Sequence, residues 1–416
     1  MRYDVVIIGG GLSGLTCGIR LQEAGKNCAI ISTGQSALHF SSGAFDFLNK
    51  LPDGTRVMHP LDAIKRLGGN HPYRKIGEEK IREYVADVQD WFGKSGIVLH
   101  GDVEKNHYCL SPIGIIKSAW LSFDDFEPLE TADAFPYRRV AVANFAGFID
   151  FYPRFIADAL AEKGVECRIE ILNIPAVEKL RTNPTEMRSA NIARVFDSEA
   201  QLENLLTLIN DLSEEVDAVI LPAVFGLSSV YPLEYIRKYS EKPVFFISPV
   251  PPSVPGIRVQ KRLQERFVEL GGTFFLGDTV EKAFFDGDTV IGITTNNHSD
   301  IQFYAEQYVL ASGSFFSKGI ISRSNEIYEP VLNADVEYDS QRDNWFCKNV
   351  FDVQPYMSYG VKTDAGFHPL RDGVPVSNMF AIGSVLSGYN PLEEGCGSGV
   401  AILTALHVAN TILISD

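Results

Sequence analysis

The chain lacks the features of a membrane-spanning or nucleic-acid-binding protein. Its 416 residues contain no apolar run that approaches the roughly 20 residues needed to cross a bilayer. Positive charge is also scarce, because 53 Asp and Glu residues outnumber 37 Lys and Arg residues and leave a formal net charge of −16. This acidic balance disfavours nucleic acid and anionic lipid as partners, so no nucleic acid is expected.

The N-terminus lacks a targeting segment. An apolar strand pattern begins within a few residues of Met1, with no basic region, apolar core or small-residue cleavage site before it. The chain is therefore expected to be made and kept in the cytosol, with no signal peptide and no transmembrane segment. If it meets a membrane, another protein must bring it there.

The six cysteines are scattered and form no C-x-x-C pair. This spacing excludes an iron–sulfur cluster or a structural zinc site held by this chain alone, so no metal is expected. Cys17 and Cys28 fall in apolar segments and are expected to be inert buried thiols. Cys396 stands in a glycine cluster and is the cysteine expected near a functional site.

What the chain does have is a glycine turn close to its N-terminus. Val5 to Ile8 form an apolar, β-branched run, as in a parallel strand that is buried on both faces. A G-x-G-x-x-G turn, an amphipathic helix and a second strand follow, and this order predicts a dinucleotide pyrophosphate at the helix N-terminus. The predicted cofactor-binding residues of the turn are Gly9, Gly11, Leu12, Ser13 and Gly14.

One part of the usual dinucleotide pattern is missing after the second strand. An acidic residue normally stands there and accepts the ribose hydroxyls, but this chain has Ser32 and Thr33. Both hydroxyls can hydrogen-bond a ribose, and both residues are predicted cofactor contacts. No arginine follows until Arg56, so no residue of the kind that binds the 2′-phosphate of NADP stands near this strand, and NADP is not expected.

Two later strands are also predicted to end in glycine turns, at 302–311 and from residue 378. A glycine cluster then opens an apolar helix over 400–413, where free N–H groups and the helix dipole favour an anionic or electron-rich group. The predicted cofactor contacts in these segments are Ser312, Gly313, Gly383, Ser384, Gly397, Ser398 and Gly399.

These signals predict an α/β domain that is discontinuous in sequence, made of residues 1–48, 255–323 and 368–416. Residues 49–254 and 324–367 are expected to form an inserted substrate or subunit-interface domain. The local patterns also predict further elements. They are helices at 152–163 and 258–270, strands at 218–221 and 273–276, and a hairpin of strands 280–285 and 290–295.

Three motifs together carry a family resemblance. The GGGLSGL of residues 9–15, the VLASG of 309–313 and the FAIGS of 380–384 resemble flavoproteins with a two-dinucleotide-binding fold. Residues 34–43 and 51–54 resemble a narrower group, the B-subunit family of the anaerobic glycerol-3-phosphate dehydrogenases. The resemblance implies a Rossmann-like FAD/NAD(P)-binding flavoprotein domain.

The resemblance also implies an activity and partners. Such an enzyme oxidises sn-glycerol 3-phosphate to dihydroxyacetone phosphate and passes electrons to quinone. The A and B subunits form the dehydrogenase part, and an iron–sulfur C subunit holds them at the cytoplasmic side of the inner membrane. An alternative is that this chain is a non-catalytic flavin electron-relay or scaffold subunit, and that its partner holds the substrate.

The cofactor has two candidates. The family assigns FMN to the B subunit, whereas the turn at 9–14 suits a pyrophosphate and hence FAD. Flavoproteins of this fold usually have Gly-Asp at the end of the late strand, where the Asp binds the ribityl chain, but Ser384 follows Gly383 here. Both FMN and FAD stay open.

Three residues are candidates for catalysis. Alcohol oxidation needs a base and a cationic group for the substrate phosphate, which His39 or His368 and Arg371 can supply. Each has a structural alternative, namely a hydrogen-bonded loop histidine or a surface arginine beside Asp372. Three residues that follow His39 in a segment that runs beside the flavin in this fold are predicted cofactor contacts, namely Ser41, Ser42 and Gly43.

Overall fold

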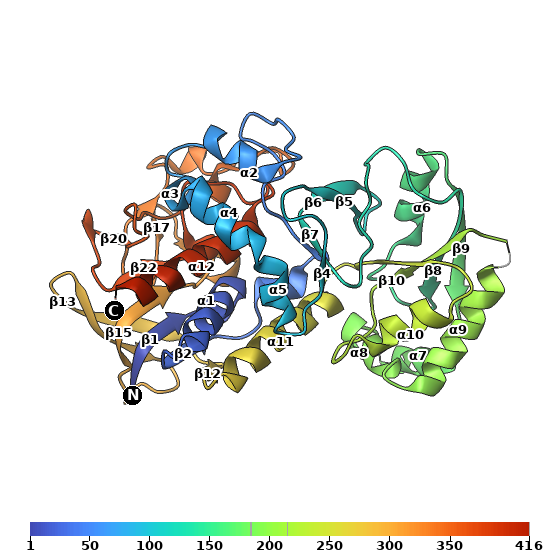
Figure 1. The fold of residues 1–416 in the computed structure, drawn as a ribbon, viewed down its shortest axis with the longest axis horizontal. Coiled ribbons are helices and arrows are strands. Elements are labelled where there is room, and N and C mark those ends of the chain that lie inside the picture. Colours follow the sequence, from blue (N-terminus) through green and yellow to red (C-terminus); the bar gives the residue numbers. More distant parts are fainter. Residues whose placement is uncertain (184, 214, 416) are drawn as a thin grey trace. The chain divides into compact units, whose positions relative to one another are not determined.

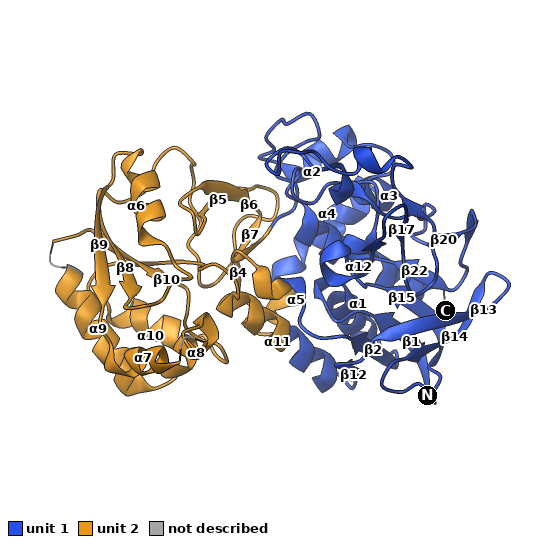
Figure 2. Ribbon diagram, turned by 180° about the vertical axis from the view of Figure 1, so that it is seen from behind, with its two compact units in different colours: residues 1–37, 46–91, 262–416 blue, residues 38–45, 92–261 orange. Residues whose placement is uncertain are grey.

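The chain forms two compact units in a computed structural model, which describes residues 1–183, 185–213 and 215–415 (Figure 2). Unit 1 comprises residues 1–37, 46–91 and 262–416, and unit 2 comprises residues 38–45 and 92–261. Each unit contains a parallel sheet of its own.

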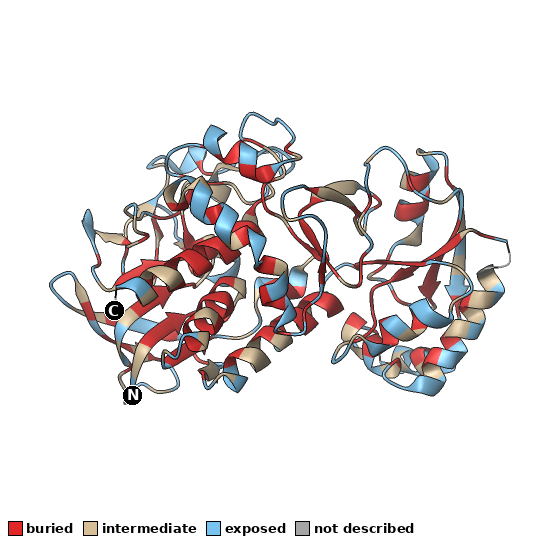
Figure 3. Cartoon of the chain, viewed as in Figure 1, coloured by how far each residue is buried: buried red, intermediate tan, exposed pale blue. Residues whose placement is uncertain are grey.

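A five-stranded parallel sheet forms the centre of unit 1, in the order β12-β2-β1-β15-β22. Its strands are β1 (Arg2–Ile8), β2 (Cys28–Ser32), β12 (Thr273–Leu276), β15 (Tyr304–Leu310) and β22 (Met379–Ala381). β1 and β2 read as apolar runs because both of their faces are covered, and Val6 and Ile30 have no exposed surface. β2 is buried along its whole length and β1 from Val5 to Ile8, and these parts are coloured as buried in Figure 3.

Helices α1 (Leu12–Glu23) and α12 (Gly397–Ile414) pack against each other beside this sheet (Figure 1). The short helices α3 (Pro72–Ile76) and α4 (Glu78–Ala86) pack on α12. Contrary to the expectation from the sequence that no apolar run approaches the length of a membrane span, α12 is long and apolar enough to cross a membrane by length and composition alone, with a mean hydropathy of 1.6, and 61% of its residues are buried within the protein. A core helix of a globular domain has the same composition.

Small antiparallel pairs complete unit 1. The hairpin of β13 (Val280–Asp286) and β14 (Thr289–Thr295) is the largest of them. The other pairs are β16 (Ile321–Ser322) with β17 (Ile327–Tyr328), β18 (Val336–Glu337) with β19 (Gly360–Val361), and β20 (Leu370–Arg371) with β21 (Val374–Pro375). Unit 1 also contains the short helix α2 (Pro60–Ala63), and the short helix α5 (Val88–Gly93) runs from unit 1 into unit 2.

Unit 2 contains a four-stranded parallel sheet in the order β11-β10-β8-β9. Its strands are β8 (Arg139–Phe145), β9 (Glu166–Leu172), β10 (Ala218–Pro222) and β11 (Val244–Ile247). The helices are α6 (Pro153–Ala161), α7 (Pro175–Glu178), α8 (Ser189–Val195), α9 (Glu199–Ser213) and α10 (Tyr231–Tyr239). Short antiparallel strands are β3 (Ala44–Phe45), β4 (Leu99–His100), β5 (His107–Leu110), β6 (Ile116–Ala119) and β7 (Leu121–Phe123).

The structure confirms the α/β class and most of the predicted elements. The helix expected at 258–270 is α11 (Val254–Glu269), and those expected at 152–163 and 400–413 are α6 and α12. The compact units divide the chain differently from the expected domains, since residues 49–91 and 324–367 lie in unit 1 and residues 38–45 and 255–261 lie in unit 2. Unit 2 also has a parallel sheet, of which the sequence indicated one strand, at 218–221.

Candidate functional site

The carboxyl ends of the strands of unit 1 meet at one edge of its sheet, where ligands bind in open α/β sheets. Gly9 has φ +119°, and a Cβ there would lie 2.2 Å from the Ala311 carbonyl oxygen, so the ends of β1 and β15 touch. A Cβ on Gly383 would lie 2.4 Å from Ser13 Oγ and 3.8 Å from Ala401 Cα. The N-terminal glycine turn and the C-terminal glycine cluster therefore lie together.

The N-terminus of α1 has the properties of an anion site. Gly14 sits so close to the turn that a Cβ would lie 1.9 Å from the Gly9 carbonyl oxygen. Gly11 is the N-cap, no side chain caps the helix, and its first turn carries no acidic residue. Its N–H groups and the positive end of the helix dipole are thus available to a phosphate.

A buried hydroxyl without a partner lies at the end of β15. The Ser312 Oγ is buried and has no hydrogen bond within the described part of the chain. Beside it, Gly313 has φ +85°, and a Cβ there would lie 3.6 Å from Ser384 Oγ. Leaving a buried hydroxyl unpaired costs about 1–3 kcal/mol, so a bound polar group at this position would stabilise the site.

The start of α12 is fixed to the segment after β3. Ser398 Oγ accepts a hydrogen bond from Asp46 N at 2.7 Å, and Gly399 N donates to Asp46 O at 2.8 Å. Thr404 Oγ accepts from Gly383 N at 3.0 Å and so ties α12 to the end of β22. Cys396 is the N-cap, and Gly397 begins a first turn that has no side-chain cap and no acidic residue.

A buried polar cluster precedes this turn. His71 Nδ1 accepts from Tyr73 N at 3.1 Å, which leaves the ring proton on Nε2 to donate to Glu394 at 3.0 Å. Cys396 Sγ lies 3.8 Å from the same carboxylate, and burial beside Glu394 raises the pKa of this thiol well above its ordinary value. The three groups are of the metal-ligating kind and lie within 4.8 Å of one another, but these hydrogen bonds already satisfy them.

At the end of β2 the two predicted ribose contacts differ. Ser32 is buried and donates to Gly34 O at 3.2 Å, whereas Thr33 is exposed and accepts from Thr279 at 3.1 Å. Asp278 follows the neighbouring strand β12, but its buried carboxylate accepts bonds from the backbone, a threonine and a histidine. It therefore does not replace the acid that the sequence lacks.

His368 and Arg371 lie in unit 1, before β22. His368 Nδ1 donates to Met379 O at 2.9 Å, which directs the basic lone pair to Nε2, and its ring stacks on Phe380 at 4.4 Å. The Arg371 guanidinium stacks on Phe285 with its carbon 4.4 Å from the ring centre.

His39, Ser41, Ser42 and Gly43 lie in unit 2. Burial lowers the pKa of His39, although a hydrogen bond to Gln260 opposes the shift, so the ring is neutral at neutral pH. Ser42 Oγ accepts from Lys117 at 2.7 Å, and Gly43, with φ +101°, packs against the ring of Phe126.

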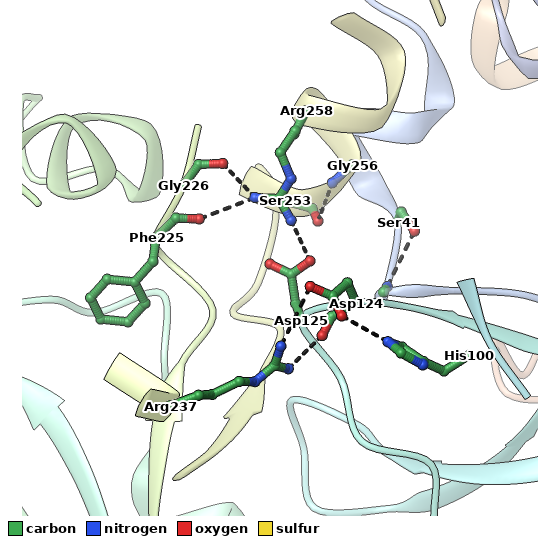
Figure 4. A network of polar contacts seen from close by, with 11 residues as sticks. Ser41, His100, Asp124, Asp125, Phe225, Gly226, Arg237, Ser253, Gly256 and Arg258 are labelled. Atoms are coloured by element: carbon green, nitrogen blue, oxygen red, sulfur yellow. Dashed lines mark hydrogen bonds and ion pairs between the residues drawn. The ribbon is translucent and has the colours of Figure 1, made fainter. Parts of the chain in front are cut away.

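Unit 2 also holds a charged network around Arg258, and Ser41, drawn in the same view, accepts a hydrogen bond from Gly43 N at 3.2 Å (Figure 4). Arg258 on α11 is buried and pairs with Asp125, and it donates to the carbonyl oxygens of Phe225 and Gly226. Sequence reasoning missed this network, as it missed Asp46, Thr404 and Glu394 in unit 1. Their partners are far away in sequence, so no local pattern identifies them.

The comparisons with known proteins agree with this geometry. Residues 4–400 match the family model described as an FAD binding domain. The B subunit of the anaerobic glycerol-3-phosphate dehydrogenase of Yersinia enterocolitica is 43% identical over an alignment of 417 positions, which covers 99% of this chain and 98% of the relative. The chain belongs to this B-subunit family. The B subunit of Pectobacterium atrosepticum is 42% identical, with 99% of both chains covered, and that of Mannheimia succiniciproducens is 37% identical over 100% and 99%.

Membership of this family makes the chain a flavoprotein, and the edge of the unit 1 sheet fits a flavin phosphate. The uncapped N-terminus of α1 suits the phosphate, and the partnerless Ser312 hydroxyl suits a polar group of the cofactor. The glycine contacts leave no room for side chains in this region, so the backbone itself can approach the ligand.

Proposed function

We propose that the chain is the flavin-carrying B subunit of a quinone-linked glycerol-3-phosphate dehydrogenase. It would take part in the oxidation of sn-glycerol 3-phosphate to dihydroxyacetone phosphate. The observation that carries the proposal is the full-length match to B-subunit relatives, in a chain whose N- and C-terminal glycine segments meet at one sheet edge.

Each predicted site residue has a separate role in the proposed oxidation. A bound flavin supplies the acceptor for the hydride that leaves the substrate carbon. The N–H groups from Gly11 to Ser13 would hold its phosphate, and the Ser312 hydroxyl would hydrogen-bond the cofactor. His368 Nε2 would take the proton of the substrate hydroxyl, with His39 as the alternative base. Arg371 is the candidate cation for the substrate phosphate, but its stacking on Phe285 places it at the amino end of β22, at the opposite edge of the sheet from the glycine turns.

FMN is the first cofactor candidate and FAD is the second. An adenosine would extend toward the end of β2, where Ser32 donates to its own loop and Asp278 is fully engaged. The lack of a carboxylate directed at a ribose supports FMN. Mass and absorbance spectrometry of the small molecule released from the purified protein separates the two.

The partners in this proposal are an A subunit, which completes the dehydrogenase, and an iron–sulfur C subunit, which anchors the complex. The relatives carry the names of B subunits, which supports a multi-subunit enzyme. Electrons would pass through the C subunit to quinone on the cytoplasmic side of the inner membrane.

The test is anaerobic bleaching of the flavin absorbance by sn-glycerol 3-phosphate in the reconstituted A–B pair. We expect bleaching with the wild type and at least tenfold slower bleaching with His368→Gln, because removal of a general base typically costs about 10²–10⁴ in rate. No bleaching in the wild-type pair contradicts the proposal. Normal bleaching with His368→Gln, His39→Gln and Arg371→Gln would show that these residues are not needed for the reaction, and the proposed activity would still stand.

One observation favours the relay alternative. Arg371, the residue that would bind the substrate phosphate, stacks on Phe285, so its guanidinium already has an aromatic partner. In a relay, substrate reduces the flavin of the isolated partner, and this chain alone is never reduced by substrate. Stopped-flow reduction of each of the two proteins separately distinguishes the two functions.

A further inference from the structure

Strand β9 forms one edge of the parallel sheet of unit 2, beside β8 (Figure 1). On its inner side it pairs with β8, in register from Glu166 to Leu172. On its outer side no strand pairs with it within residues 1–183, 185–213 and 215–415. β9 contains no proline and no glycine, so its sequence leaves this edge able to pair with a further strand.

Every second residue of β9 directs its backbone groups to this outer edge. The Leu172 carbonyl accepts from Ala146 N at 3.0 Å, on the side of β8, because Ala146 directly follows that strand. Residues two apart in a strand direct their N–H and C=O groups to the same side, and the residues between them direct theirs to the other side. The residues whose backbone groups face the outer edge are therefore Cys167, Ile169 and Ile171.

The side chains of β9 alternate between apolar and charged. Ile169 and Ile171 are 37% and 52% exposed. The residues between and beside them carry charge, and Arg168 forms ion pairs with Glu170 and Glu215. The side chains of Arg168 and Glu170 are 41% and 29% exposed, so water screens their pair and both groups can take a new partner at little cost.

This pattern is complementary to itself. When two copies of β9 pair antiparallel about Ile169, each Ile169 faces its counterpart, and Arg168 of either copy faces Glu170 of the other. The outward-facing residues then fall at the hydrogen-bonded positions of the pairing. The charged residues fall at the positions between them, where facing side chains come closest. One register therefore satisfies both the backbone groups of the edge and its charges.

We propose that β9 is the contact through which two copies of this chain form a two-fold symmetric dimer, in which the parallel sheets of the two copies join into one. The occupant of the edge is a second copy, because two-fold symmetry by itself sets the opposite charge against both Arg168 and Glu170. Charge on an edge strand usually keeps strands apart, but that requires like charges to meet, and here each charge meets its opposite. The pairing needs neither flavin nor substrate, so it stands or falls separately from the proposed function.

The test is charge reversal, with sedimentation velocity of the purified full-length chain. Arg168→Glu sets acidic side chains against each other in the pairing, and Glu170→Arg does the same with basic ones. We expect the wild type to dimerise, and each variant alone to dimerise with a dissociation constant at least about tenfold higher. An equimolar mixture of the two variants should recover the dimer, because opposite charges face each other again in the mixed pair. A substitution that only damaged the fold would not give this recovery.

The control is Arg323→Glu in unit 1, which also reverses an exposed arginine that forms an ion pair. This variant should dimerise as the wild type does. The melting temperature of each variant checks that it is folded. A wild type that stays monomeric at every concentration overturns the proposal, as does a dimer that neither β9 variant weakens, or a mixture of the two variants that does not recover it.

Hydrogen exchange of the wild type provides a second measurement if a variant does not fold. The amides of Cys167, Ile169 and Ile171 should exchange at least about tenfold more slowly in concentrated than in dilute protein, because only the dimer gives them partners. Equal rates reject the contact. Protection that appears only when another subunit is added would mean that the edge binds that subunit and would overturn the choice of a second copy.

Discussion

At the residue scale, Gly14 gives the sharpest test of the candidate site. Because its Cβ would lie 1.9 Å from the backbone oxygen of Gly9, Gly14→Ala must push α1 away from the turn. We expect loss of bound flavin and destabilisation by about 1–3 kcal/mol, as for an overpacked core. The measurements are the flavin-to-protein absorbance ratio and urea unfolding. Gly68→Ala is the control, because nothing lies within 4 Å of its Cβ, and full flavin occupancy in Gly14→Ala contradicts the site.

A second prediction at this scale concerns pH. Burial lowers the pKa of His407 on α12 from 6.5 to about 4, with a smaller effect of Lys80. Between these values the unfolded chain binds a proton that the folded chain does not, so stability falls as pH falls from 6.5 to 4. The slope due to His407 is at most about 1.4 kcal/mol per pH unit.

The measurement for His407 is urea unfolding at several pH values. His407→Gln should flatten the acid side of the stability curve without abolishing it, since His107 in unit 2 has a similarly lowered pKa of about 4. Tyr84→Phe, which removes the hydroxyl 3.3 Å from His407 Nδ1, should keep the wild-type slope because burial causes most of the shift. An unchanged slope in His407→Gln would show that this group is not neutral when folded.

Which single residues the sequence could identify depends on the range of their interactions. Gly9, Gly11 and Gly14 can be identified from the sequence, because their role depends only on a local turn of six residues. Ser312 is a predicted contact from its place after a strand, but only the fold shows that its hydroxyl has no hydrogen bond within the described part of the chain. Glu394 is beyond local reasoning, because its partner His71 is 323 residues away.

At the scale of an element, helix α11 depends on the buried pair of Arg258 and Asp125 (Figure 4). Asp125→Asn leaves a buried guanidinium without its counter-charge and should destabilise unit 2 by about 3–5 kcal/mol. Hydrogen exchange of the β8 and β10 amides reports on this unit directly. The double replacement of Asp125 by Leu and Arg258 by Met should recover most of the loss.

The control for this pair is the exposed pair of Arg323 and Glu326, whose side chains are 63% and 45% exposed. Glu326→Gln should change stability by less than about 1 kcal/mol, because water screens the pair. Equal effects of Asp125→Asn and Glu326→Gln would mean that burial does not strengthen the first pair.

The positions of the helices and strands along the chain were more predictable than the compact unit to which each segment belongs. Periodicity and glycine or proline boundaries placed α6, α11, α12 and the β13–β14 hairpin within a few residues. They could not show that the segment 49–91 belongs with unit 1. That membership comes from contacts such as Tyr73 OH to Phe47 O at 2.7 Å and Lys75 Nζ to Thr363 Oγ at 2.7 Å, which the sequence pattern does not encode.

At the scale of the whole molecule, charge and the burial of α12 decide how the chain meets a membrane. A net charge of −16 repels anionic lipid, and α12 is mostly buried against the rest of unit 1. We expect the isolated chain to stay in the supernatant when vesicles of phosphatidylethanolamine and phosphatidylglycerol are sedimented. The complete complex should sediment with them. Sedimentation of the isolated chain that persists in high salt would mean that α12 leaves the core, because a salt-resistant attachment requires buried apolar surface rather than charge.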